Sequence, residues 1–210
     1  MKFLSGLILI IGSQFSNAAL VDMDWNTSGD AALMLDTSSG LHWLDLSVTA
    51  NQSYDFVNTQ FQQGGAYEGF RYATQTEVLA LWAEAGISNT GFNWIENAEW
   101  QQIKNLADRL GTSTLFYSEG IATHALGLVE GGLPLSSNQR WVMELTYHPD
   151  GLQVRTSSEN YILDTNFASV HYSSYLVQAV PLPPSILLFA SGFLGLVGFR
   201  GFCKINFKRI

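Results

Sequence analysis

The segment GFRYATQTEVLALWAEAG, residues 69–86, carries a complete set of signals for a short strand followed by a helix. Phe70 and Tyr72 alternate with other residues as in a strand. Thr74 and Glu77 have the spacing of a capping box, in which two side chains satisfy backbone N–H groups at a helix start. Apolar residues then recur at helical spacing: Val78, Leu81, Trp82 and Ala85. Gly86 is a typical helix terminator, so the segment predicts an amphipathic helix that ends there.

The residues before this segment predict a β-hairpin. Residues 31–35 and 41–46 are apolar runs, and the DTSSG stretch between them, residues 36–40, has the composition of a tight turn. Trp43 is expected to anchor the buried face of this hairpin.

Two more helices are expected, one before and one after residues 69–86. Ser53 can cap a helix that runs through Phe61. Another helix is expected from about residue 96 to Leu110, with Gly111 as its stop.

After Gly111 the pattern changes to that of strands. Four segments have this composition: LFYSEG, HALGLVEGG, RWVMELTYHPDGLQVRT and HYSSYLVQAV, residues 115–120, 124–132, 140–156 and 171–180. Pro149, Asp150 and Gly151 are expected to turn a second hairpin. This order, with a hairpin first, then helices and then several strands, predicts an α+β fold. We expect one domain, residues 19–179, with an antiparallel sheet and two or three helices.

The N-terminal end has the layout of a secretory signal peptide, residues 1–18. Lys2 provides a positive charge, residues 3–12 are apolar, and residues 16–18, Ser-Asn-Ala, form a small-x-small site, so cleavage is expected between Ala18 and Ala19. The alternative is a retained membrane helix, but ten apolar residues are short for a bilayer that needs about 20.

The C-terminal end, residues 180–210, combines a proline strip, an apolar segment and a basic tail. Residues 186–199 carry no charge and are expected to form a transmembrane helix. Four cations follow that segment: Arg200, Lys204, Lys208 and Arg209. Cations on this side predict that the tail end stays in the cytoplasm while the body is exported.

This end of the chain resembles a PEP-CTERM sorting signal in its Val-Pro-Leu-Pro variant. The resemblance is carried by Val180, Pro181, Leu182 and Pro183, which are followed by the glycine-containing apolar segment and the basic end. The resemblance implies recognition by an exosortase, a membrane transpeptidase that removes the tail and passes the protein to the cell surface. Pro184 stands where the family usually has a small residue, and the basic cluster is diluted. An ordinary single-pass anchor is the alternative.

Two motifs of the body resemble those of many PEP-CTERM proteins. They are GLHWLDL, residues 40–46, and GFRYATQTEV, residues 69–78. More distantly, the body is similar to Lcl-type C-terminal domains. That similarity implies a shape related to C-type lectins and makes sugar binding a candidate activity.

The charge of the body excludes one class of partner. All 18 acidic residues lie between Asp22 and Asp164, against five basic ones in the same stretch. Nucleic acid is therefore not an expected partner, because phosphate binding depends on Lys and Arg. The single cysteine, Cys203, lies in the tail, so the body has neither a disulfide nor a thiol nucleophile.

No enzyme motif or metal motif is found. The four histidines are scattered: His42, His124, His148 and His171. Asp22, Asp24 and Asp30 are close in sequence, but they lack the glycine and the closing glutamate of a calcium loop, so we interpret them as solvated acids. No metal and no cofactor is expected. Paired carboxylates of a secreted hydrolase stay open as an alternative, since their spacing in space is not given by sequence.

The sequence predicts specific contacts for two side chains of the body. Trp94 lies in a polar stretch and is the candidate ligand contact, because an exposed indole suits a sugar ring. Arg71 is expected to be a buried ion-pair partner for a hairpin acid such as Asp45.

Together these observations predict a non-catalytic exported protein. It would be held in the inner membrane by its tail before processing, and then released to the cell surface or an exopolysaccharide matrix. Its expected partners are an exosortase-type transpeptidase, the membrane and extracellular polysaccharide. The alternatives are a carbohydrate- or calcium-binding module and a secreted hydrolase.

Overall fold

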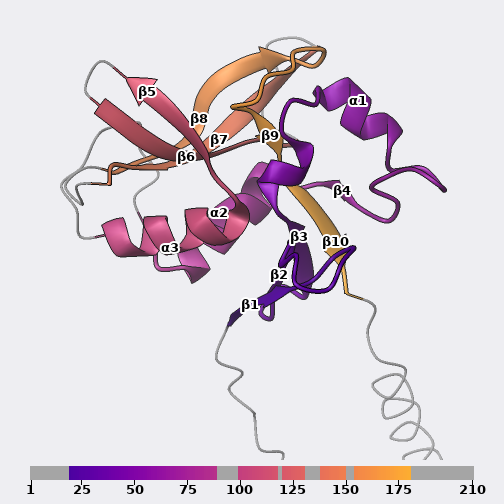
Figure 1. Ribbon diagram of the computed structural model, residues 1–210, viewed down its shortest axis with the longest axis horizontal. Coiled ribbons are helices and arrows are strands. Elements are labelled where there is room, and N and C mark those ends of the chain that lie inside the picture. The colour runs from indigo at the N-terminus through magenta and orange to yellow at the C-terminus, as the bar shows by residue number, and fades with distance from the viewer. Residues whose placement is uncertain (1–18, 89–98, 118–119, 131–137, 150–153, 181–210) are drawn as a thin grey trace, which may run out of the picture. The chain divides into compact units, whose positions relative to one another are not determined.

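The computed structural model describes residues 19–88, 99–117, 120–130, 138–149 and 154–180 (Figure 1). The chain divides into two compact units, Met1–Ala179 and Val180–Ile210, and the helices and strands described here belong to the first. They confirm an α+β fold with antiparallel strand pairing and three α-helices. The expectation of one sheet is wrong, because the strands form two.

The first sheet contains strands from both ends of the body. Its order is β1 (Leu20–Met23), β2 (Leu33–Asp36), β3 (Leu41–Leu44), β10 (Leu176–Ala179) and β4 (Arg71–Tyr72), and every neighbouring pair is antiparallel. The β2–β3 hairpin confirms the hairpin predicted from residues 31–46. The last strand of the body is therefore a central strand of this sheet.

The second sheet is made from the later part of the chain. Its order is β5 (Ser113–Tyr117), β6 (Gly120–Leu128), β7 (Gln139–Tyr147) and β8 (Val154–Asp164), all antiparallel, while β9 (Ser173–Ser174) pairs parallel with β6. The antiparallel pairing of β7 with β8 confirms the second predicted hairpin. Asp150 and Gly151 of its expected turn lie outside the described residues.

The first helix, α1 (Tyr54–Thr59), begins where it was predicted and ends earlier. The Ser53 hydroxyl accepts the Phe56 N–H at 3.2 Å, which confirms Ser53 as the cap. The helix ends at Thr59 and not at Phe61. The Gln60 N–H bonds back to the Val57 carbonyl at 2.9 Å, which closes the last turn.

The helix predicted within residues 69–86, α2 (Gln75–Glu84), has the predicted capping box. The Thr74 hydroxyl accepts the Glu77 N–H at 3.2 Å, and the Glu77 carboxylate accepts the Thr74 N–H at 2.8 Å. Gly86 has a φ of 82°, the left-handed conformation in which glycine ends a helix. Each of these interactions is local in sequence, so the sequence was enough to predict the helix.

The third helix, α3 (Trp100–Leu110), ends as predicted. Gly111 follows it with a φ of 83°. Residues 96–98 of the expected helix lie outside the described residues. A short 3-10 helix, η1 (Leu46–Thr49), had not been predicted; the Asp45 carboxylate caps it by accepting the Ser47 N–H at 2.7 Å.

The two sheets share two hydrophobic cores. Met143 and Leu145 of β7 belong to the core that α2 and α3 complete, whereas Val142, on the other face of the same strand, belongs to the core that includes α1. Figure 1 shows α2 and α3 together along the second sheet. The first sheet contributes to both cores, with Trp43 in one and Leu44 in the other. Trp43 is buried, as predicted.

Arg71 does not pair with a hairpin acid. Its guanidinium forms two bonds with the Glu77 carboxylate, Nη1 to Oε2 at 2.9 Å and Nη2 to Oε1 at 2.6 Å, and its side chain is 49% exposed. Asp45 follows β3, and β10 lies between β3 and β4 in the sheet. The expected partner is therefore wrong, because a strand from the far end of the chain separates the two residues.

The Arg71–Glu77 pair predicts a specific loss of stability in acid. The Arg71 bonds, together with the Thr74 N–H, lower the pKa of Glu77 from 4.5 to about 2. A carboxyl whose pKa is lower in the folded chain stabilises the fold above its ordinary pKa, and this contribution is lost as the pH falls through the folded pKa. The difference in unfolding free energy between wild type and Glu77→Gln should therefore be largest above pH 4.5 and shrink toward pH 2. Chemical denaturation across this range measures it; a difference that is independent of pH would contradict the assignment.

Candidate functional site

Two of the residues predicted for export and sorting, Ala19 and Val180, are the first and last residues that the structure describes. The Ala19 N–H donates to the Thr37 hydroxyl at 2.9 Å, and the Ala19 carbonyl accepts the Thr37 N–H at 3.1 Å. Val180 is half-buried and follows β10 directly. The other residues predicted for export, sorting or ligand contact lie outside the described residues: Ala18, Trp94, Pro181, Leu182, Pro183, Arg200, Lys204, Lys208 and Arg209.

The expected transmembrane segment, residues 186–199, also lies outside the described residues. Among the residues that the structure does describe, no helix combines the length and the apolar character needed to cross a bilayer.

Two of the three acids near Ala19, Asp24 and Asp30, organise a loop, whereas Asp22 lies in β1. The Asp30 carboxylate accepts backbone N–H groups from Trp25 at 2.8 Å and Thr27 at 2.9 Å. These backbone bonds, with that from Trp25 first, hold the pKa of Asp30 well below its usual value. Asp24 accepts the Ala31 N–H at 3.1 Å. N–H groups directed at a carboxylate occupy positions that a calcium ion would need, so this loop is built for backbone capping.

A buried polar cluster connects β6 with β7. His124 Nδ1 lies 2.7 Å from the Thr146 hydroxyl and 3.5 Å from Glu144 Oε1, and the Thr146 hydroxyl donates to Glu144 Oε1 at 2.5 Å. The His124 and Glu144 side chains are 0% and 1% exposed. This set has the residue types of a nucleophile, a base and an acid, but its Thr146 is fully buried and is not presented to a substrate. Its position indicates a structural network.

A small cavity lies beside this cluster. Its volume is about 50 Å³, and His124, His171, Thr112 and Ser173 are among its lining residues. The fold thus brings together two histidines that are 47 positions apart in sequence. Nowhere in the described ranges do three His, Cys, Asp or Glu side chains form a group that could hold a metal ion.

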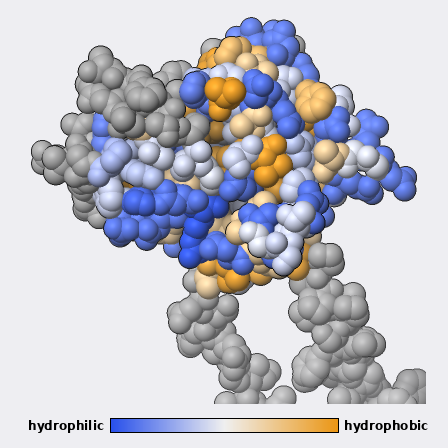
Figure 2. Space-filling model, viewed as in Figure 1, coloured by the Kyte–Doolittle hydropathy of each residue, from blue (hydrophilic) through white to orange (hydrophobic). Residues whose placement is uncertain are grey.

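A groove with a larger volume than this cavity lies between β1 and α3. It has a volume of about 510 Å³ and is partly open to solvent. Leu20, Ala85 and Leu106 provide apolar lining, and the polar lining comes from one face of α3: Gln102, Asn105, Asp108 and Arg109. Figure 2 shows a hydrophilic surface over α3 and apolar groups along the adjoining lower edge of the molecule.

The charged groups of the groove are tied to the fold. Arg109 donates to the Leu20 carbonyl at 2.6 Å and lies 3.6 Å from Asp22, which links α3 to β1. Asp108 accepts the Tyr147 hydroxyl at 2.6 Å and also binds Lys104. Arg109 and Asp108 are therefore each held in place, and each lies beside a group of opposite charge.

The amide groups of the groove are placed differently. Asn105 Oδ1 accepts Gln101 Nε2 at 2.7 Å along the exposed side of the helix. Gln102 Oε1 is buried, and within the described part of the chain it has no hydrogen-bond partner. A buried acceptor without a donor is costly, and its burial also closes this oxygen to a ligand or water in the groove.

Sequence reasoning did not find the groove. It predicted α3, but the strand that forms the opposite wall, β1, gave no alternating pattern: three of its four residues are exposed. No local signal in the sequence indicates that this strand lies beside α3.

No protein-family model, no curated protein and no solved structure matches this chain. The function therefore has to be inferred from the groove, the buried cluster and the tail themselves.

Proposed function

We propose that this chain is an exported, non-catalytic surface protein whose tail is a PEP-CTERM-like signal for an exosortase-type transpeptidase. The observation that carries the proposal is the order of three features: the strip that begins at Val180 and Pro181, the uncharged segment 186–199, and the cations from Arg200 onward. In this proposal the segment spans the inner membrane before processing. The processed protein then reaches the cell surface or an exopolysaccharide matrix.

The position of β10 supports this proposal. Ala179 pairs with Leu41 of β3, and Leu176 pairs with Tyr72 of β4, so the last strand is held on both sides. Val180 follows with no linker. Prolines at 181 and 183 lack N–H groups and disfavour helix, so the strip can present extended peptide bonds to a processing enzyme.

Two further features bear on the body. The non-catalytic assignment is supported by the burial of Thr146 beside His124 and Glu144, which leaves that set without access to a substrate. The likeness in shape to C-type lectins is the finer part of the proposal. It is supported by the resemblance of residues 40–46 and 69–78 to the motifs of those families.

The sorting proposal is tested by replacing Pro181 and Pro183 with alanine together. Without the prolines the helix can extend into the strip and hide the peptide bonds that a transpeptidase must reach. The double variant is expected to accumulate at full length in the inner membrane, whereas wild type appears shorter, at the surface or in the medium. Fractionation and immunoblotting measure both properties.

Pro149→Ala, an exposed proline of the body, is the matched control and should be processed like wild type. If the double variant and wild type have the same size and location, the tail is an ordinary single-pass anchor and the sorting proposal is wrong.

A further inference from the structure

We propose that Asn26 is the attachment site of an N-linked glycan. It lies in the segment Asp-Trp-Asn-Thr-Ser, residues 24–28, and an asparagine followed two positions later by serine is the acceptor motif for N-linked sugars on exported proteins. The motif is short and common, so its place in the fold decides whether it can be used. The inference rests on export of the body, which is the first part of the proposed function, and not on processing of the tail.

The loop after β1 presents the motif to solvent. Residues 26–28 are exposed, and Gly29 follows them with a φ of 88°. A Cβ atom at Gly29 would meet no heavy atom within 4 Å other than those of its chain neighbours, so the space beside the motif is open. An enzyme that carries a large sugar donor can therefore reach this loop while the body stays folded.

The loop is held in place by groups other than those that the reaction needs. The Asp30 carboxylate accepts the Asn26 backbone N–H at 3.0 Å, and the Trp25 ring stacks on that of Tyr67 with the centroids 6.1 Å apart. Within the described part of the chain, no hydrogen bond joins the Asn26 amide or the Ser28 hydroxyl to another group. The two side chains that define the motif are thus left for a partner outside the chain.

A second Asn-x-Ser motif, residues 51–53, is placed differently. The Ser53 hydroxyl accepts the Phe56 N–H at 3.2 Å as the cap of α1, and the Asn51 N–H donates to the Ser169 carbonyl at 3.0 Å. A transferase that bound this motif would have to break the start of a helix. The fold therefore favours Asn26 over Asn51.

The bonds that change are confined to the Asn26 amide and the sugar donor, an oligosaccharide linked to a polyprenyl diphosphate. Nδ2 attacks the anomeric carbon, and a C–N bond forms. The bond from this carbon to the diphosphate oxygen breaks, and the polyprenyl diphosphate leaves with the electron pair. One proton of Nδ2 passes to a base of the transferase. Asp24 lies two positions before Asn26, where oligosaccharyltransferases of bacteria also read an acidic residue.

A glycan at Asn26 would cover an exposed edge of the body. β1 is an edge strand of the first sheet, and its Val21 and Met23 side chains are 43% and 38% exposed. An edge strand with exposed apolar side chains is a template for pairing with another chain. A bulky hydrophilic group on the loop that follows this strand would oppose such pairing.

The test is site-resolved mass spectrometry of the protein purified from the envelope and the growth medium of its own cells. Peptides that contain Asn26 should carry the added mass of an oligosaccharide. The added mass should be lost in Asn26→Gln and in Ser28→Ala, and kept in Ser28→Thr, because threonine retains the hydroxyl of the motif. Asn51→Gln is the matched control and should leave the modification unchanged.

The N-terminus of the same sample separates this inference from the proposal for export. A chain that begins at Ala19 and has an unmodified Asn26 overturns the inference and leaves export standing. A chain that still begins at Met1 and carries no sugar overturns both. Persistence of the added mass in Ser28→Ala, or its loss in Asn51→Gln, would show that Asn26 is not the residue that a transferase modifies.

Discussion

Replacing His124 with leucine is expected to lower the free energy of unfolding by about 1–3 kcal/mol, the usual cost of leaving a buried polar group without its hydrogen-bond partner. His124 and Glu144 are both almost completely buried, and Glu144 Oε1 lies 3.5 Å from His124 Nδ1. Leucine restores volume but cannot bond the carboxylate. Glu144 would then stay buried with the Thr146 hydroxyl but without the imidazole. Urea denaturation followed by tryptophan fluorescence measures the change.

A double variant separates the pair from simple packing. Adding Glu144→Gln to His124→Leu replaces the carboxyl group that the single variant leaves without the imidazole, so the double variant should be more stable than His124→Leu alone. The double-mutant cycle then gives the coupling between the two side chains. If His124→Leu costs no more than an ordinary surface change, about 0.5 kcal/mol, the pair does not stabilise the fold.

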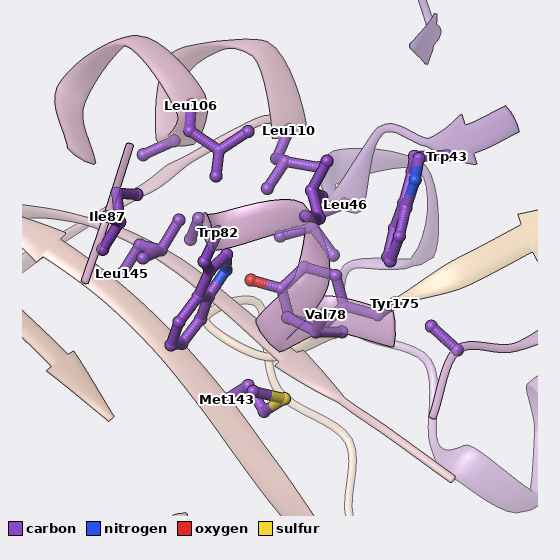
Figure 3. Packing of buried hydrophobic residues seen from close by; sticks show 14 of the residues in the cluster. Trp43, Leu46, Val78, Trp82, Ile87, Leu106, Leu110, Met143, Leu145 and Tyr175 are labelled. Carbon is purple, nitrogen blue, oxygen red and sulfur yellow. The ribbon is translucent and has the colours of Figure 1, made fainter. Parts of the chain in front are cut away.

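Replacing Trp82 with alanine is expected to cost about 3–5 kcal/mol, the range for emptying the volume of a large aromatic side chain in a core. Trp82 is 0% exposed. Figure 3 shows it between Ile87 on one side and Tyr175 on the other, with Met143 close by. These neighbours come from the residues after α2, from the segment before β10 and from β7, so the indole joins three parts of the fold. A thermal or chemical unfolding transition measures the loss.

Thr76→Ala provides the control for this prediction. Thr76 lies in the same helix and is exposed, so its replacement should change stability by no more than about 0.5 kcal/mol. Equal effects of the two substitutions would show that the helix, and not the core contact of Trp82, limits stability.

The parts of the fold that could be predicted are those with local causes. The Thr74–Glu77 capping box, the Gly86 and Gly111 helix ends and the β2–β3 hairpin each depend on residues within a few positions of one another. The α1 end was wrong by two residues, because an i to i−3 bond at Gln60 closes the helix before any glycine is reached. Helix ends are set by such small local choices, which composition does not resolve.

The candidate site was not predictable in the same way. His124 and Glu144 lie 20 positions apart and meet only because β6 pairs with β7 in the register that aligns Leu126 with Glu144. Gln102 and Leu20 are separated by 82 positions, and their groove exists because β1 pairs with β2 near α3. Trp94, the contact chosen from sequence, lies outside the described residues and stays a prediction.

The amino-acid order alone was enough for the α+β class, the starts of α1 and α2, the acidic character of the body and the expectation of a sorted tail. Two features came from the tertiary structure alone: the strands form two sheets, and β10 enters between β3 and β4, which keeps Arg71 away from Asp45. The physical reason is range. Capping and turn formation are interactions between near neighbours, whereas strand order depends on which distant apolar faces bury each other best, and a single sequence carries no local record of that choice.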